Sequence, residues 1–229
     1  MKKLIVALLF LTGIAVYSQV TPVKSTVERA QSMTVLITNN STTGMGMGTG
    51  VLLDATHVLT CFHMERSYKD DFMVFTYPLG QVVKAKVEGG NQAEDILILT
   101  LSTAVTVSET PVFTETYAIG EPITVVGNAL GGMQWFVTHG IISGEEQGYL
   151  ETDALVNPGN SGGPWFNDKG EIVAITDWRL GPGEHVPGLA GGVSAKKINL
   201  MLKARQAQSE MQGIMLQILG NANIHEGTK

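Results

Sequence analysis

A glycine-rich turn in the second half of the chain isolates a single serine. Residues 157–164 read Asn-Pro-Gly-Asn-Ser-Gly-Gly-Pro, so that Ser161 lies between Gly159 and Gly162. Glycines let a backbone bend tightly, which can expose the hydroxyl and turn backbone N–H groups toward one point. A serine nucleophile and its oxyanion hole require that geometry. The same residue types also form ordinary loops, so the turn alone leaves a nucleophile and a plain loop as alternatives.

A serine hydroxyl needs partners before it can attack a carbonyl carbon, because it keeps its proton at neutral pH. An adjacent imidazole can take that proton, and a buried carboxylate can hold the imidazole in the correct tautomer. The chain has five histidines and 21 acidic residues. These three groups can be distant in sequence, so the fold must bring them together.

The elements that would position such a site are short β-strands in two sets, separated near Tyr117. Most segments alternate in polarity or are rich in Val, Ile and Thr, and Gly, Asn or Pro residues lie between them. The first set is predicted at residues 33–38, 50–53, 72–77, 81–88 and 95–101. The second set is predicted at residues 122–126, 135–142, 149–152, 171–176 and 189–193. Two runs of short antiparallel strands predict an all-β protein built from two small barrels.

Near the end of the chain, the spacing between apolar residues changes to that of a helix. The apolar residues that fall largely on one helical face are Ile198, Met201, Leu202, Met211, Ile214, Met215 and Ile218. They predict an amphipathic helix over residues 196–219, with Gly220 as its stop signal and 220–229 as a flexible tail. We expect the stripe to be a packing face, although exposed methionines would suit an oligomer. A short helix is also expected from Val27 to Met33.

The first residues have the layout of an export signal. Lys2 and Lys3 precede an apolar run from Leu4 to Val16, and Tyr17-Ser18-Gln19 follows. The alternative is an uncleaved anchor, but the run is shorter than the roughly 20 apolar residues that cross a bilayer. We therefore expect residues 1–18 to be a signal peptide, the protein to be periplasmic or secreted, and no stable membrane span to remain.

The net charge limits the kinds of partner that the protein can bind. The cysteine content limits how its fold can be stabilised. The formal net charge is −6 at pH 7, which argues against nucleic acid as a partner because phosphate binding needs a basic surface. Cys61 is the only cysteine, so the exported chain must hold its core without an internal disulfide. Because it lies in an apolar run, Cys61 is expected to be a small buried residue.

Several segments together resemble trypsin-like serine proteases, most of all the HtrA/Deg group. Gly-Asn-Ser-Gly-Gly-Pro at 159–164 resembles the nucleophile motif, and Val-Leu-Thr-Cys-Phe-His at 58–63 resembles the strand that leads to the catalytic histidine. Asp-Ile-Leu-Ile-Leu at 95–99 resembles the segment that supplies the aspartate. The remaining matching segments are 48–54, 127–131, 140–143 and 152–154. The likeness runs in register from about Val27 to about Leu202.

The resemblance implies a fold and a mechanism. The fold would be two antiparallel six-stranded β-barrels, at 25–117 and 118–195, followed by the C-terminal helix. The implied function is a serine endopeptidase that acts on proteins or peptides through an acyl-enzyme and needs no metal or cofactor. His63, Asp95 and Ser161 would form the catalytic triad in the cleft between the barrels. The backbone N–H groups of Gly159 and Ser161 would form the oxyanion hole.

Each predicted triad residue has competitors in the sequence. The other histidines are His57, His139, His185 and His225, and the competing carboxylates are Glu94, Asp70 and Asp71. His63 follows a strand at the position that matches the family motif. Asp95 begins an apolar strand, where a charged side chain usually has a functional role. A catalytically inactive binding module on the same fold and a β-sandwich adhesin are alternative functions. The complete triad argues against the first, and the ordered motifs argue against the second.

The resemblance also points to residues that would bind the substrate. In the family, the floor of the pocket for the side chain before the cleaved bond lies five and six positions ahead of the nucleophile, at Val156 and Leu155. The opposite wall is expected from Gly191, Gly192 and Val193, and Trp178 lies in the strand that pairs with substrate backbone. Apolar residues cannot neutralise Lys or Arg, so small or medium apolar side chains are the expected preference.

Two features bear on how the enzyme would be regulated. Asn160 precedes the nucleophile, whereas digestive relatives have an aspartate that pairs with a new N-terminus after activation. HtrA-like members also have Asn there, so activation by such a cleavage is not expected. Typical HtrA proteins continue into a peptide-binding (PDZ) domain, but a helix and a tail are all that we expect after residue 195.

Overall fold

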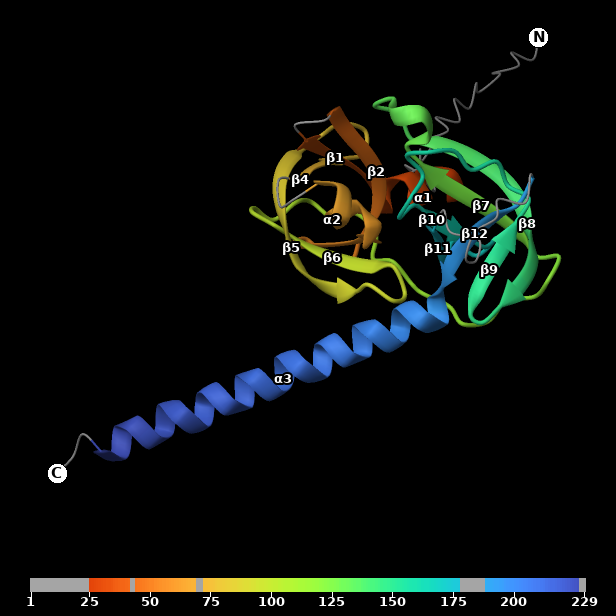
Figure 1. The fold of residues 1–229 in the computed structure, drawn as a ribbon. Coiled ribbons are helices and arrows are strands. Elements are labelled where there is room, and N and C mark those ends of the chain that lie inside the picture. Colours follow the sequence, from red (N-terminus) through yellow and green to blue (C-terminus); the bar gives the residue numbers. More distant parts are fainter. Residues whose placement is uncertain (1–24, 42–43, 69–71, 178–187, 227–229) are drawn as a thin grey trace, which may run out of the picture.

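The computed structural model describes residues 25–41, 44–68, 72–177 and 188–226 (Figure 1). They form two closed barrels of antiparallel strands and a long C-terminal helix. This confirms the predicted all-β class and its two six-stranded barrels. The expected signal peptide at residues 1–18 lies outside the described residues.

The first barrel contains the predicted histidine and aspartate. Its strands close in the order β1-β2-β3-β6-β5-β4. Their bounds are β1 Thr34–Ser41, β2 Gly44–Leu52, β3 His57–Cys61, β4 Phe72–Thr76, β5 Val82–Asn91 and β6 Ile96–Leu101. In β4, Phe72, Val74 and Thr76 are buried and alternate with half-buried residues, as expected when one face of a strand lines a barrel.

The second barrel contains the serine turn. Its strands close in the order β10-β11-β12-β9-β8-β7. Their bounds are β7 Pro122–Gly127, β8 Phe136–Glu146, β9 Tyr149–Thr152, β10 Pro164–Phe166, β11 Ile172–Asp177 and β12 Ala190–Ser194, with a 3-10 turn η1 at Ala129–Gly131. Strand β10 was not predicted, because its three residues are all buried and show no alternation.

The two barrels pack through a shared apolar layer. Leu59 and Ile96 of the first barrel belong to the same buried cluster as Phe166, Ile175 and Val193 of the second. All five are fully buried. Complete burial of such a side chain stabilises the fold by about 1.5–3 kcal/mol. Leu59 lies on β3, which leads to His63, and Ile96 follows Asp95, so this layer fixes one barrel against the other next to these residues.

A short helix, α1 (Thr26–Met33), confirms the helix expected before the first strand. Ser25 and Glu28 form a capping box, in which the Glu28 N–H donates to Ser25 Oγ at 3.2 Å and the Ser25 N–H donates to Glu28 Oε2 at 2.9 Å. Each bond satisfies an N–H that the first helical turn leaves free. Ala30 and Met33 pack into the layer between the barrels.

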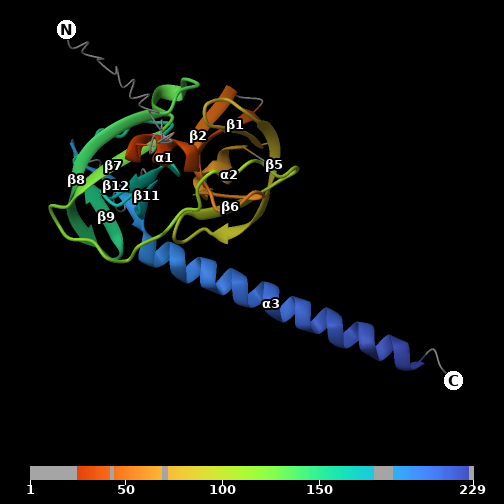
Figure 2. The same ribbon diagram turned by 180° about the vertical axis from the view of Figure 1, so that it is seen from behind.

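The C-terminal helix α3 (Ala195–Glu226) extends away from both barrels (Figures 1 and 2). Contrary to expectation it does not end before Gly220, because one glycine costs a helix only about 1 kcal/mol and no proline follows it. The expected packing face is covered by the barrels only in the first turns of the helix. Ile198 is buried, but Met211 and Ile214 are 70% and 59% exposed, since this part of α3 has left the barrel surface.

The first turns of α3 are held on the barrels by charged residues. Lys197 Nζ binds Glu94 Oε2 and lies 4.4 Å from the centre of the Tyr149 ring. Further along, Arg205 Nε donates to Glu88 Oε1 at 2.7 Å. Among the described residues, no helix combines the length and the apolar character that a membrane crossing requires.

Candidate active site

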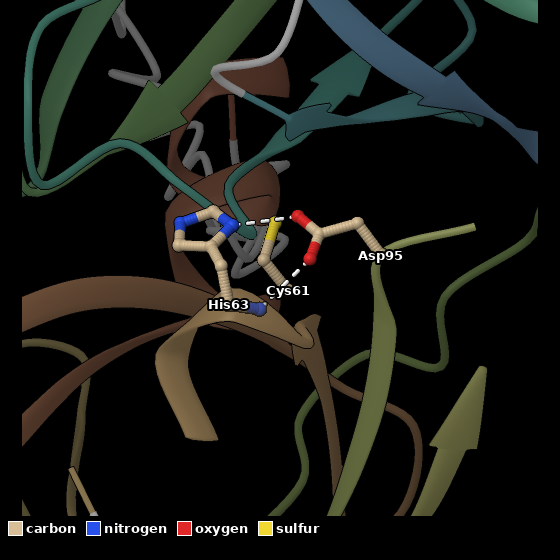
Figure 3. Close-up of side chains that lie close together, drawn as sticks. All are labelled: Cys61, His63 and Asp95. Atoms are coloured by element: carbon tan, nitrogen blue, oxygen red, sulfur yellow. Dashed lines mark hydrogen bonds and ion pairs between the residues drawn. The ribbon is translucent and has the colours of Figure 1, made fainter. Parts of the chain in front are cut away.

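The pairing of β3 with β6 brings His63 and Asp95 together. Cys61 at the end of β3 lies opposite Ile96 at the start of β6, and the Phe62 N–H donates to the Asp95 carbonyl at 3.0 Å. Asp95 therefore lies beside the first residue of α2 (His63–Tyr68). Its Oδ2 is 2.6 Å from His63 Nδ1, and its Oδ1 accepts the His63 backbone N–H at 2.8 Å (Figure 3).

Asp95 is buried and ionised. It is 3% exposed and has a φ of 54°, a left-handed conformation that Asp tolerates better than most residues. Burial raises the pKa of Asp95, but the hydrogen bonds and charge of His63 and a hydrogen bond from Asp177 together bring the pKa below its ordinary value. The carboxylate can therefore hold Nδ1–H toward itself and leave His63 Nε2 free of a proton.

The serine turn joins β9 to β10 and needs glycine at two positions. Gly159 has a φ of +102°, and a Cβ there would lie 2.1 Å from the Asn128 carbonyl oxygen. Gly162 has a φ of +82°, and a Cβ there would lie 2.2 Å from the Thr49 carbonyl oxygen. Without a Cβ, Gly162 can approach β2 of the first barrel and Gly159 can approach the segment after β7 of the second.

Hydrogen bonds fix Ser161 to the first barrel. The Thr49 N–H donates to the Ser161 carbonyl at 2.9 Å, and Thr49 Oγ1 donates to the Gly159 carbonyl at 2.7 Å. The Thr176 carbonyl of β11 accepts both the Gly162 N–H at 2.8 Å and the Cys61 thiol at 3.0 Å. The serine turn and the strand leading to His63 therefore share one acceptor.

The backbone of the turn leaves two N–H groups free for a ligand. The Pro158 carbonyl accepts the Leu130 N–H at 2.8 Å. Because the C=O and N–H of a trans peptide point in opposite directions, the Gly159 N–H points away from Leu130. Within the described residues, neither the Gly159 nor the Ser161 N–H donates a hydrogen bond.

Cys61 is buried, as expected, and lies close to His63 and Asp95 (Figure 3). The three side chains offer polar atoms within 4.8 Å of one another. Burial, followed by the charge of Asp95, raises the pKa of the Cys61 thiol well above its ordinary value. A metal would need the thiolate, so this donor set does not fit a metal centre.

Several of the competing residues lie in other surroundings. Glu94 binds Lys197 and accepts the Tyr149 hydroxyl at 3.1 Å. His57 Nδ1 is 2.8 Å from Asp54, and His139 Nδ1 is 3.1 Å from Thr124 Oγ1 on an exposed face. Asp70, Asp71 and His185 lie outside the described residues, as does the side chain of His225.

The residues expected to bind the substrate side chain lie in different surroundings. Leu155 is 66% exposed, whereas Val156 packs in the core of the second barrel. Gly191 pairs with Asp177, and a Cβ on Gly192 would lie 2.8 Å from the Trp165 ring. Val193 belongs to the layer between the barrels. Trp178 lies outside the described residues, so the pocket stays a prediction.

Asp177 is a site residue whose role the sequence left open. It ends β11, is 2% exposed and contributes to the lowered pKa of Asp95. An acidic residue at the end of a buried strand was the available signal, and Asp95 likewise stands at the edge of a buried strand, at its start.

Comparison with known proteins places this arrangement in a family. Residues 48–175, more than half of the chain, match the trypsin-like peptidase domain. The chain is 32% identical over 135 residues to "Serine protease Do-like HtrA" of Lactobacillus helveticus, covering 52% of this chain and 32% of the relative. It is 28% identical over 171 residues to "Probable periplasmic serine protease do/HhoA-like" of Haemophilus influenzae, covering 69% and 36%.

A third relative, "Probable periplasmic serine endoprotease DegP-like" of Hahella chejuensis, is 32% identical over 103 residues, covering 40% of this chain and 21% of the relative. The chain thus matches about a third or less of the length of these curated relatives. The domain match covers both the histidine strand and the serine turn. Together with the two six-stranded barrels, this match shows that the chain belongs to the trypsin-like peptidase family.

Proposed function

We propose that this protein is a serine endopeptidase in which Ser161 is the nucleophile, His63 the general base and Asp95 the residue that orients His63. The observation that carries the proposal is the short contact of 2.6 Å between His63 Nδ1 and the buried Asp95. The glycine turn around Ser161 is fixed through Thr49 to the barrel that carries this pair. A carboxylate, an imidazole and a serine in such a site favour acyl transfer.

The chemistry follows from these groups. Ser161 Oγ attacks the scissile carbonyl carbon while His63 Nε2 takes its proton, and Asp95 stabilises the imidazolium. The negative charge on the substrate oxygen is stabilised by the N–H groups of Gly159 and Ser161. The C–N bond breaks as His63 donates the proton to the leaving amine. Water then hydrolyses the acyl-enzyme, with His63 again taking a proton and returning it to Ser161.

Proteins or peptides are the proposed substrates, with cleavage after small or medium apolar residues. Neither Leu155 nor Val156 could neutralise a basic side chain in a buried pocket, and an unpaired charge there would cost several kcal/mol. Gly191 and Gly192 keep the opposite strand without side chains, although the Trp165 ring fills the space beside Gly192. A selectivity of this kind is expected to be modest, because one methylene changes transition-state binding by only about 1–3 kcal/mol.

We also propose that the protein is exported. Lys2, Lys3 and the apolar run after them favour an export signal, and the names of two relatives include the word "periplasmic". Cell fractionation followed by N-terminal sequencing tests this. A mature chain that begins near Gln19 in the exported fraction would support it, and a full-length cytosolic chain would contradict it.

A fluorophosphonate probe tests the proposed nucleophile directly, because it reacts with an activated serine hydroxyl. The wild-type chain should be labelled at Ser161 and should cleave casein, whereas Ser161→Ala should show neither. Ser143→Ala is the matched control, since Ser143 is a serine of β8 outside the turn, and it should behave like the wild type. Unlabelled, folded wild-type protein would contradict the proposal.

A further inference from the structure

We propose that Lys197, in the first turn of α3, is a positioning residue for Asp95 and acts through the side chain of Glu94. The inference rests on the proposed function for its catalytic meaning, because Asp95 is the residue proposed to orient His63. It gives the beginning of the C-terminal helix a role in the active site.

The turn between β5 and β6 carries Asp95 in an uncommon backbone conformation. Asp95 has a φ of 54°, in the left-handed region, where a residue other than glycine stays only if its surroundings hold it. Within the turn, Asn91 Oδ1 accepts the N–H groups of Ala93 at 3.0 Å and of Glu94 at 3.3 Å. These bonds fix the shape of the turn. Its place in the molecule depends on bonds that reach beyond it.

Such bonds come from both barrels. On the first barrel, the Phe62 N–H donates to the Asp95 carbonyl at 3.0 Å. On the second, the Glu94 carboxylate accepts the hydroxyl of Tyr149 on β9 at 3.1 Å and binds Lys197 Nζ. Lys197 Nζ also lies 4.4 Å from the centre of the Tyr149 ring, so the three side chains form one cluster. Glu94 therefore ties the turn of the first barrel to the second barrel and to α3.

The cluster is placed to hold Glu94 firmly. The side chains of Lys197 and Glu94 are 19% and 32% exposed, so water and salt screen this pair less than a fully exposed one. Burial, followed by the charge of Glu94, raises the pKa of Tyr149 to about 12, so the phenol keeps the proton that it donates. Ala195 and Ile198, on either side of Lys197, are fully buried. The ammonium group thus projects from a part of α3 that is itself fixed.

The Glu94 side chain can affect Asp95 because the two residues share a peptide bond. That bond is planar, so fixing Glu94 fixes the plane from which the Asp95 backbone continues. Asp95 Oδ2 lies 2.6 Å from His63 Nδ1, and a misplacement of about 1 Å at a catalytic group can lower a rate by up to about 10². We therefore expect the loss of Lys197 to lower kcat. KM should change little, since the cluster contains none of the residues proposed to bind substrate.

A second ion pair between α3 and the same pair of strands provides a matched control. Arg205 Nε donates to Glu88 Oε1 at 2.7 Å, and the two side chains are 34% and 32% exposed. Glu88 lies on β5, before the turn, and is not joined to Asp95. Arg205→Met therefore removes a bond between α3 and the first barrel without removing the one beside Asp95.

The first test compares kcat and KM on a peptide substrate. Lys197→Met keeps most of the aliphatic side chain but removes the charge, and kcat should fall about tenfold with KM within about twofold. Lys197→Arg should restore most of the loss, because a guanidinium also binds a carboxylate. Arg205→Met should keep the wild-type kcat. A wild-type kcat in Lys197→Met, or equal losses in the two methionine variants, would overturn the proposal.

A double-mutant cycle tests whether Lys197 acts through Glu94. Glu94→Ala removes the carboxylate and should lower kcat about as much as Lys197→Met does. If the two residues act as one unit, the double variant should lose little more than either single variant. A loss in the double variant equal to the product of the two single losses would show that Lys197 acts by another route, and the proposal would fail.

Hydrogen exchange measured by NMR in the full chain separates this proposal from the proposed function, because it needs no activity. The Phe62 N–H reports on its bond to the Asp95 carbonyl, and the Leu101 N–H, which donates to the Thr56 carbonyl at 2.8 Å, is a reference at the other end of β6. In Lys197→Met, the Phe62 N–H should exchange at least about tenfold faster while the Leu101 N–H keeps its rate.

Equal acceleration of both amides would indicate general destabilisation and overturn the positioning role. An unchanged Phe62 rate would overturn it as well. If the wild-type chain shows neither peptidase activity nor probe labelling, the endopeptidase assignment fails, and the exchange rates still decide whether Lys197 holds the turn that carries Asp95.

Discussion

Thr49 of the first barrel donates its backbone N–H to the carbonyl of Ser161 in the second barrel, at 2.9 Å. Its side chain makes two further bonds, donating to the Gly159 carbonyl at 2.7 Å and accepting the Asn128 N–H at 2.9 Å. One residue thus fixes the serine turn against the barrel that carries His63 and Asp95. The precision of the site depends on this contact between the barrels.

Replacing Thr49 by Val should therefore damage the site without removing a catalytic group. The substitution keeps the shape but leaves the Gly159 carbonyl and the Asn128 N–H without their partner, which costs about 1–3 kcal/mol for each buried group. We expect a lower denaturation midpoint and at least a tenfold lower kcat/KM. Thr49→Ser keeps the hydroxyl and should stay close to the wild type in both measurements. Equal effects of Val and Ser would contradict the role of the Oγ1 bonds.

Replacing Asp95 by Asn should lower kcat by about 10⁴, because the amide would favour the wrong tautomer of His63. The measurement is steady-state kinetics on a peptide substrate. Glu94→Gln is the matched control, since Glu94 binds Lys197 and Tyr149 rather than His63. A larger loss in Glu94→Gln than in Asp95→Asn would mean that the wrong carboxylate has been assigned.

Stability should fall in acid through the carboxylates that are ionised in the fold. Burial raises the pKa of Asp95 and Glu88, but His63 and Arg205 respectively lower each pKa below its ordinary value of 3.8 or 4.5. These groups bind fewer protons in the folded state than in the unfolded state. Their stabilisation is thus fully present above the ordinary values and is lost as the pH falls through the lowered ones.

Urea midpoints measured from neutral pH down to pH values below these should show that decline. Glu88→Gln removes one of the groups and its bond to Arg205, so its curve should start lower and fall less steeply. Midpoints that rise as the pH falls in this range would contradict the assigned directions.

Fragments of casein, identified by mass spectrometry, should show the selectivity of the proposed pocket. We expect most cuts after Val, Ala or Leu, because Val156 and Leu155 offer no negative charge to a basic side chain. Leu155→Asp should shift some cleavage toward Lys and Arg, because Leu155 is exposed, whereas Val156→Asp would bury a charge in the core of the second barrel and lower its stability. A majority of cuts after Lys or Arg in the wild type would refute the pocket while leaving the triad intact.

The sequence predicted those parts of the molecule that depend on local pattern. Alternating or apolar runs between glycines predicted most strands, and the barrels confirm that prediction. The order of the motifs around His63, Asp95 and Ser161 suggested the family. Strand β10, with three residues, and helix α2, with six, were not predicted, because elements this short show too little periodicity.

The behaviour of α3 could not be read from its apolar spacing. The pattern of Met211, Ile214, Met215 and Ile218 indicates a helix, but whether that face is covered depends on the direction in which the helix leaves Ser194. Ala195 and Ile198 are buried against β11 and β12, and beyond Arg205 the helix has passed the barrel surface. The spacing of apolar residues indicates that the segment is a helix. Which residues cover that helix depends on the path of the chain in the folded protein.

By itself, then, the sequence determined the strand content, the glycine turn around Ser161 and which histidine and carboxylate match a family pattern, because these follow from local residue types and their order. Only the tertiary structure decided that Asp95, 32 residues from His63 along the chain, is buried with its Oδ2 at 2.6 Å from His63 Nδ1. The reason is physical: the ionisation of a buried carboxyl depends on which groups surround it in space, and a barrel closure brings together residues that no local pattern relates.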